Sequence, residues 1–295
     1  MGTQAIHRFR SWVEQLLAQP RSRLIWQLSA VLVVLHGIDQ FEWIRLPERL
    51  LALALLLRPQ WLAAPVAWLG LSGLLGLNTL IGWSALVNHE YLITYWVWVC
   101  AIATVAQAPG PVLAINAQRL IGLCFGFATL WKLLGGEYLD GSFLHLTLLL
   151  DSRLALGARL LGRVSTDLLD DNQTIFSSLS ATAAPAALHT TSLLTWTSLL
   201  LSYWTIAIEG LIAIAFLFPR LKRLHALRDG LLLLFILTTY TLIPVFAFAA
   251  ILLLMGLAQT YSPRRQRVYL ILLLLLPLWL PLPQLVFYLL TSIGG

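Results

Sequence analysis

A lysine at the end of a long apolar run is the residue of this 295-residue chain best placed to do chemistry. Lys132 follows Trp131 just before Gly135 and Gly136. A lysine held in apolar surroundings can act as a base, because desolvation disfavours the ammonium form and so lowers the pKa of the amine. The alternative is that Lys132 only extends to the membrane interface, with Trp131 in an aromatic belt. The spacing leaves both interpretations open.

Two further residues carry chemistry. His89 lies in the segment Asn88-His89-Glu90-Tyr91, and Glu209 lies well inside another apolar run. An acid at the middle of a bilayer costs at least about 2.5 kcal/mol on insertion scales, so it usually faces a polar partner or an aqueous cavity. We therefore predict that Glu209 faces the helix bundle, where a protonated carboxyl bonded to a neighbouring helix is the structural alternative. His36 and Asp39, at the end of the first span, are weaker candidates of the same kind. A histidine in a short loop, such as His89, is more often solvated than catalytic.

The composition predicts the elements that must position these residues. The chain is 59% hydrophobic and 11% charged, with a mean hydropathy of +0.82, which is typical of a polytopic all-α membrane bundle. Spanning the hydrocarbon core takes roughly 20 apolar residues. Twelve tryptophans and eight tyrosines suit two interfacial belts. We predict about eight spans, near residues 24–38, 44–57, 61–83, 91–106, 112–134, 191–218, 231–258 and 268–290.

The residues before the first span predict an interfacial helix. In the segment 1–23, apolar side chains recur at helical spacing, arginines occupy other positions of the turn, and Pro20 ends the pattern. The apolar positions are Ile6, Phe9, Val13, Leu16 and Leu17. Such a helix is expected to lie on an anionic membrane surface.

Loop charge predicts the orientation of a single transmembrane domain over residues 24–290. Four arginines before the first span place the N-terminus in the cytoplasm. The polar segment at about 135–190 then lies outside, and the basic loop near Arg220 lies inside. Pro244 predicts a kink or break within 231–258. Whether that segment crosses once or forms a broken hairpin stays open.

With this topology, two polar clusters share the extracytoplasmic face. One is the segment 88–91, and the other is Lys132 with Glu137 and Asp140. We expect Gly135-Gly136 to end the fifth span, because glycine readily adopts the left-handed cap conformation. Asp140-Gly141 is expected to form the turn that starts the next element.

Several function classes lack their motifs. There is no nucleotide-binding loop, no metal-ligand spacing and no nucleic-acid motif, so neither a metal nor a nucleic acid is expected. Cys100 and Cys124 lie inside apolar runs, which makes a disulfide framework unlikely to be the organising feature. The pI of 9.7 reflects basic cytoplasmic loops, which suit anionic lipids as partners.

The segment from 87 to 255 resembles the membrane domain of the vitamin K-dependent gamma-carboxylase family, also called the horizontally transferred transmembrane domain. The family shows an Asn-His-x-Tyr-Leu segment, then a Lys-Leu pair followed by an aromatic or apolar residue and a glycine, then a span that carries an acid. The corresponding residues here are Asn88-His89-Glu90-Tyr91-Leu92, Lys132-Leu133, Leu139-Asp140-Gly141 and Glu209.

The resemblance implies a quinone or another isoprenoid lipid as ligand at the extracytoplasmic face, with a vitamin K-like quinol as the cofactor. Lys132 stands where the family has the base that deprotonates the hydroquinone, and His89 stands near that quinol. Asn88, Tyr91, Trp131 and Glu209 are the expected ligand-binding residues. The family tends to carry a histidine where this chain has Ile236, Leu237, Thr238 and Thr239, so carboxylation of protein glutamates is not expected.

Two functions of another class stay open. One is a non-catalytic membrane protein that binds a lipid or pigment, or serves as an accessory subunit of a membrane complex. The other is a small transporter, which the intramembrane Glu209 and the break at Pro244 would suit.

Overall fold

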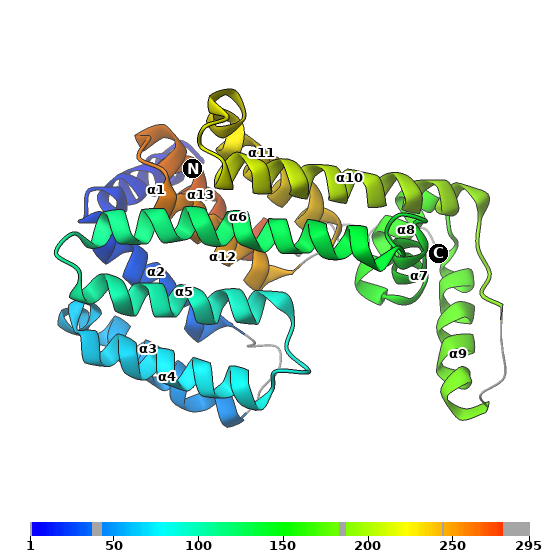
Figure 1. Cartoon of the computed structure of the whole chain (residues 1–295), viewed down its shortest axis with the longest axis horizontal. Helices are drawn as coiled ribbons and strands as arrows, with labels where there is room; N and C mark the ends of the chain where they lie inside the picture. Colours follow the sequence, from blue (N-terminus) through cyan, green and yellow to red (C-terminus); the bar gives the residue numbers. More distant parts are fainter. Residues whose placement is uncertain (1, 37–42, 183–186, 244, 280–295) are drawn as a thin grey trace. The chain divides into compact units, whose positions relative to one another are not determined.

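The computed structural model describes residues 2–36, 43–182, 187–243 and 245–279, and it contains no strand within these ranges. Helices of very different length follow one another along the chain (Figure 1). They are α1 (Gly2–Leu17), α2 (Arg21–Leu35), η1 (Trp43–Arg45), α3 (Leu46–Leu57), η2 (Pro59–Ala63), α4 (Pro65–Ile81), α5 (Asn88–Val105), α6 (Pro109–Gly135), α7 (Ser142–Leu150), η3 (Ser152–Leu154), α8 (Ala155–Gly162), α9 (Thr166–Thr182), α10 (Ser192–Leu217), α11 (Lys222–Leu242), α12 (Phe246–Gln259) and α13 (Pro263–Trp279). The prediction of an all-α fold is confirmed.

Each predicted span corresponds to a helix or to a pair of helices. The helices α2 to α6 and α10 begin and end close to the predicted boundaries. The long run 231–258 is divided, since α11 ends at Leu242 and α12 begins at Phe246, on the two sides of Pro244. The predicted break is therefore confirmed. The last predicted span, 268–290, is described only as far as the end of α13, and its remainder lies outside the described residues.

Within the described residues, two helices are long and apolar enough to cross a membrane, namely α6 and α10. The helices α4 and α12 are apolar but shorter. Two helices of membrane length are thus observed, whereas eight crossings stay a prediction.

The chain divides into two compact units. Unit 1 comprises residues 1–122 and 245–277, and unit 2 comprises 123–244 and 278–295. One boundary passes through α6, and the other passes through the break between α11 and α12. The helices α11 and α12 thus belong to different units.

The core of unit 1 contains large aromatic side chains that are completely buried. Trp68 and Trp96 are fully enclosed, and each places its indole N–H on a buried acceptor. Trp96 Nε1 donates to Ser29 Oγ at 2.8 Å, and Trp68 Nε1 donates to the carbonyl of Leu62 at 2.8 Å. These bonds satisfy the polar edge of each ring, as burial requires. The second bond also fixes η2 against α4.

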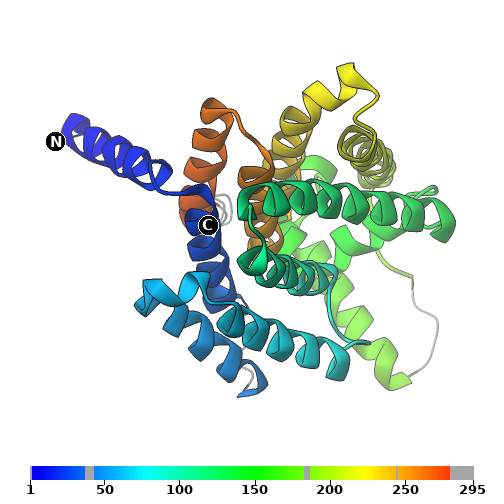
Figure 2. The same ribbon diagram turned by 60° about the vertical axis from the view of Figure 1, so that its left-hand side comes forward.

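The predicted N-terminal amphipathic segment is helical over α1, which Figure 2 shows as a separate arm leading to α2. Its Val13 is buried, whereas Arg8 and Arg10 are exposed. Phe9 and Trp12 form a tilted ring pair at 6.2 Å. The helix is confirmed, and its place on a membrane surface stays a prediction.

In unit 2, the second half of α6 runs along α10 (Figure 1). Small residues permit this approach, because a Cβ on Gly126 would lie 3.8 Å from Ala213 and a Cβ on Gly210 would lie 3.5 Å from Thr129. The C-terminal end of α6 is thereby held beside the middle of α10.

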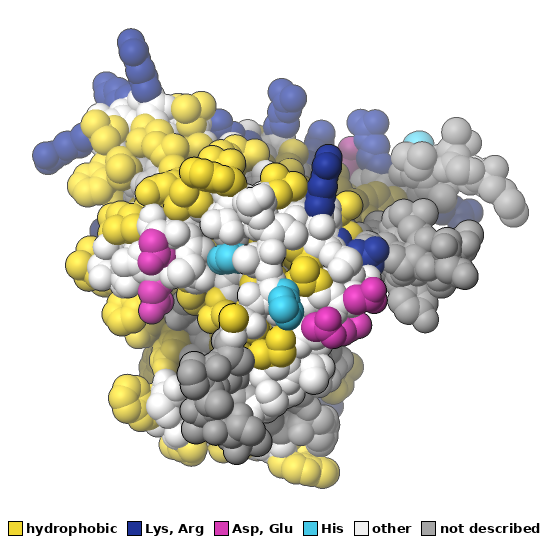
Figure 3. Space-filling view, turned by 90° about the vertical axis from the view of Figure 1, so that its right-hand side faces the viewer, with side chains coloured by type: hydrophobic (Ala, Val, Ile, Leu, Met, Phe, Trp, Pro, Cys, Tyr) yellow, Lys and Arg dark blue, Asp and Glu magenta, His cyan; other side chains and the backbone are white. Residues whose placement is uncertain are grey.

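The predicted polar segment 135–190 has a folded interior of its own. It forms α7, η3, α8 and α9, and the face drawn in Figure 3 carries acidic and histidine side chains as well as hydrophobic ones. Its buried apolar cluster comprises Leu148, Leu149, Leu154, Ala158, Val164 and Leu169, and Leu194 of α10 packs into the same cluster. The polarity of this segment was predicted, whereas its buried core was not.

The turn between α6 and α7 has the predicted form. α6 ends at Gly135, and Gly136 has φ +74°. Gly141 has φ +78° and precedes α7, while the backbone N–H of Ser142 donates to Asp140 Oδ1 at 2.8 Å. Both glycines occupy the left-handed region that other residues rarely adopt. The expected cap and the expected Asp-Gly turn are confirmed.

Candidate functional site

Lys132 and Glu209 form an ion pair inside unit 2. Nζ of Lys132 lies 2.5 Å from Oε2 of Glu209, and their side chains are only 13% and 8% exposed. α6 supplies Lys132 from its last turn, and α10 supplies Glu209 from its second half. Lys132 therefore turns toward the neighbouring helix, and Glu209 has the polar partner that its position in an apolar run requires.

An aromatic ring completes the surroundings of the amine. Lys132 Nζ lies 5.0 Å from the centroid of the Tyr138 ring, within the range of a cation–π interaction. Tyr138 in turn stacks on Phe143, with centroids 4.6 Å apart. Tyr138 belongs to the turn between Gly136 and Gly141, so the two left-handed glycines position it. Tyr138 was not among the predicted site residues, although its place in a turn bounded by Gly136 and Gly141 was visible in the sequence.

The pair can hold one proton in either of two places. With the proton on Lys132 it is an ammonium–carboxylate pair, and with the proton on Glu209 it is a neutral amine and acid. Nζ and Oε2 lie within direct hydrogen-bonding distance, so a proton exchanged between the two groups needs no bridging molecule. Removal of two charges from water is costly, which brings the neutral form closer in energy to the ionic one. The arrangement suits a group that exchanges protons with a ligand.

Asn88, His89 and Tyr91 belong to unit 1, and Asp39 lies outside the described residues. Asn88 is exposed and is the first residue of α5. His89 contacts two rings: it meets His36 edge-on with centroids 5.7 Å apart and stacks on Phe248 at 6.1 Å. The hydroxyl of Tyr91 donates to the carbonyl of Trp83. The half-buried His89 thus packs against two rings, whereas Asn88 lies at the surface.

A buried charged cluster lies beside His89. Arg45 Nη2 lies 2.5 Å from Glu90 Oε1, and Arg45 Nη1 lies 2.8 Å from His36 Nε2. The guanidinium of Arg45 can only donate, and Nε2 of His36 also lies 3.6 Å from Oε1 of Glu90. All three side chains are largely buried. We name Arg45, His36 and Glu90 the arginine cluster.

The arginine cluster changes the acidity of Glu90, which lies ahead of the apolar run that begins at Tyr91. Burial raises the pKa of Glu90, but the contacts from His36 and Arg45 and the charge of Arg45 outweigh burial and lower this pKa to about 2. Glu90 is therefore a carboxylate at neutral pH.

Two neighbouring polar residues extend the arginine cluster. Asn78 Nδ2 donates to Oε2 of the buried Glu48 at 2.9 Å, and Arg49 Nη2 donates to the carbonyl of His36 at 3.0 Å. The sequence shows these charges at the start of the short apolar run 44–57. That they turn inward was not predicted, because periodicity alone does not say which side of a short helix is covered.

The structure therefore brings some of the predicted residues together and separates others by unit. Lys132, Glu209 and Trp131 lie in unit 2, and Trp131 is 76% exposed. Asn88, His89 and Tyr91 lie in unit 1. His89 and Lys132 were predicted to lie at one face. Because they belong to different units, this stays a prediction.

Metal ligation has no candidate cluster in the described ranges, where no three His, Cys, Asp or Glu side chains are grouped to hold an ion. Both cysteines are free. Comparison of the chain with known protein families, with curated proteins and with solved structures gave no match.

Proposed function

We propose that this chain is a multi-pass membrane protein that binds an isoprenoid quinol, or a related phenolic lipid, beside Lys132 and Glu209. The observation that supports the proposal is the buried ion pair that joins α6 to α10, the two helices of membrane length. The family resemblance of the segments around Lys132 and His89 names the ligand class. Extracytoplasmic placement of the site follows from loop charge.

The residues present fit such a ligand. A phenolic hydroxyl needs a hydrogen-bonding partner, which the amine and the carboxylate supply, and a ring needs an aromatic neighbour, which Tyr138 supplies. An isoprenoid tail needs apolar surface. The half of α6 that leads to Lys132 exposes large apolar side chains, which are Phe127, Leu130, Trp131 and Leu134.

When bound, a quinol supplies an acidic hydroxyl whose loss of a proton makes the ring reactive toward oxygen. Glu209 Oε2 is the final proton acceptor in the proposal. Lys132 passes a proton from Nζ to Oε2 and takes one at Nζ from the ligand hydroxyl in exchange. The ammonium charge thus stays beside the oxygen that becomes negative, where it is most stabilising. The net transfer is one proton from the ligand to Glu209.

The experiment compares Lys132→Arg with Lys222→Arg, which changes the other lysine of the chain at an exposed position. The full chain is purified in mild detergent, co-purified lipids are identified by mass spectrometry, and binding of added menaquinol is measured. Arginine keeps the charge but does not give up a proton in a protein, so it cannot take the proton of the ligand hydroxyl in exchange. We expect Lys132→Arg to reduce quinol binding at least about tenfold (a 1.4 kcal/mol loss) and Lys222→Arg to have no effect. Equal binding by wild type and Lys132→Arg would contradict the proposal.

A second candidate function has a specific observation in its favour. The charges of Lys132 and Glu209 neutralise each other, so the pair also suits a static link between α6 and α10 in a non-catalytic lipid-binding or accessory subunit. Such a protein would retain its ligand or partner in Lys132→Arg, since arginine pairs with a carboxylate at least as well. The same two variants therefore separate the candidates.

A further inference from the structure

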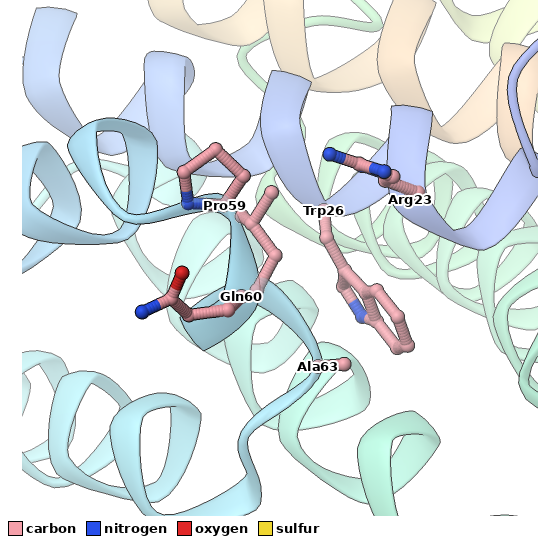
Figure 4. A pocket seen from close by; sticks show the side chains of 6 residues that line it. Arg23, Trp26, Pro59, Gln60 and Ala63 are labelled. Atoms are coloured by element: carbon pink, nitrogen blue, oxygen red, sulfur yellow. The ribbon is translucent and has the colours of Figure 1, made fainter.

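A cavity of about 490 Å³ opens in unit 1, far in sequence from Lys132. It is lined by Arg23, Trp26, Pro59, Gln60, Leu62 and Ala63. Figure 4 shows Arg23 and Trp26 extending from α2 toward the segment that carries Pro59, Gln60 and Ala63. The volume lies within the roughly 300–1,000 Å³ of small-molecule sites. Leu62 is buried and forms an apolar wall.

The polar side chains that line this cavity carry hydrogen-bond donors that have no acceptor among the described residues. Arg23 and Gln60 are exposed, and neither side chain has a hydrogen-bond or ion-pair partner among the described residues. Trp26 is buried, with only 6% of its surface exposed, yet its indole N–H has no hydrogen-bond acceptor among the described residues. A buried N–H without an acceptor costs roughly 1–3 kcal/mol, so an acceptor brought by a ligand would be favoured.

The lining also selects the charge of a ligand. It contains one guanidinium and no carboxylate. Of the three polar side chains, the guanidinium and the indole can only donate, whereas the amide of Gln60 can donate or accept. An anion with several acceptor oxygens matches this set, and a guanidinium binds a phosphate group particularly well.

The surroundings place this donor set at a surface suited to a membrane. Arg23 lies in the first turn of α2, a few residues after α1, whose Arg8 and Arg10 are exposed. Arg58, also exposed, precedes the lining residue Pro59, and the exposed Trp61 follows Gln60. Arginines beside tryptophan at the end of apolar helices are the composition of an interface with anionic lipid.

We propose that this cavity binds the phosphate of an anionic phospholipid headgroup. Arg23 pairs with phosphate oxygens, and the N–H groups of Trp26 and Gln60 donate to the remaining acceptors. The apolar wall at Leu62 and Ala63 contacts the glycerol and the first carbons of the acyl chains. The site is independent of the proposed quinol site, since it shares no residue with that site and lies in the other unit.

The test measures binding of fluorescent phosphatidylglycerol and of fluorescent phosphatidylcholine to the full chain in mild detergent. The variant Arg23→Gln removes the guanidinium, and Arg8→Gln is its matched control, because it removes another exposed arginine that lies outside the cavity. Trp26→Phe removes the indole N–H and keeps an aromatic ring, with Trp12→Phe as its control. Inorganic phosphate and glycerophosphoglycerol serve as competitors, so that a lipid and a free phosphate are distinguished.

We expect phosphatidylglycerol to bind about tenfold more tightly than phosphatidylcholine, a difference of 1.4 kcal/mol. Arg23→Gln should abolish this preference and Trp26→Phe should weaken it, while both controls retain it. Equal loss in Arg23→Gln and Arg8→Gln would show only general surface charge and would overturn the site. Inorganic phosphate that competes as strongly as the lipid would overturn the assignment to a lipid headgroup.

Discussion

At the scale of single residues, two largely buried cations pair with carboxylates that are distant in the sequence. Lys132 meets a carboxylate 77 positions away, and Arg45 meets one 45 positions away. Each pair turns two costly isolated charges into one polar contact, and removal of a single partner leaves the other charge buried. Any role of Lys132 therefore depends on Glu209, its partner in the ion pair.

The first residue-scale prediction concerns pH. Glu90 has a folded-state pKa of about 2, below its ordinary value of 4.5, so ionised Glu90 stabilises the folded state. This contribution is complete above pH 4.5 and is lost as the pH falls toward 2. We expect wild type to be more stable than Glu90→Gln at neutral pH, with a difference that shrinks across that window. Thermal unfolding in detergent at stepwise lower pH measures it.

The control for this prediction is Glu137→Gln, which changes an exposed acid near the α6–α7 turn. It should show a small difference from wild type at every pH. A stability gap between wild type and Glu90→Gln that stays constant down to pH 2 would show that the arginine cluster does not lower the pKa of Glu90.

At the scale of elements, the turn between α6 and α7 determines where Tyr138 lies relative to Lys132. Gly141 has a left-handed conformation, and a Cβ at this position would also lie 3.0 Å from Cα of Leu199 on α10. Backbone geometry and close helix approach thus both require glycine here. The turn links the packing of α7 on α10 to the surroundings of the ion pair.

We predict that Gly141→Ala destabilises the protein by about 1–3 kcal/mol, through strain and through the clash with α10. Gly136→Ala should cost less, because its φ is also positive but no atom lies within 4 Å of the added Cβ. Gly135→Ala, at a helical position with the same free space, should be neutral or slightly stabilising. Chemical denaturation of the three variants checks this order, and equal stability of Gly141→Ala and Gly135→Ala would refute it.

At the scale of the whole molecule, the distribution of lysine and arginine predicts sidedness. The loop at 84–90 and the segment 135–189 are expected outside, and the loop at 219–229 inside. The test replaces Cys100 and Cys124 and introduces single cysteines at the exposed positions Ser84, Ser165 and Arg220. A membrane-impermeant thiol reagent should label the first two from the outer side and the third only after permeabilisation. Labelling of Ser84 and Ser165 from opposite sides would disprove the topology.

Local features of the sequence determined most of the helices. Helix formation and termination depend on residues a few positions apart, so the break around Pro244, the end of α6 at Gly135 and the turn at Gly141 were predictable. The amphipathic pattern of α1 was predictable for the same reason. Polarity alone, however, did not reveal the apolar core of the segment 135–190, because its buried leucines come from several short helices.

Tertiary structure decided which side chains meet. α6 and α10 are apolar on most of their circumference, so their sequences do not specify which face turns inward. The contact of Lys132 with Glu209 depends on the rotation and the close approach of both helices, which small residues such as Gly126 and Gly210 allow. The arginine cluster and the cavity beside Arg23 likewise join residues from separate helices. Such contacts arise from packing between elements, whereas the sequence pattern reports only the order within each element.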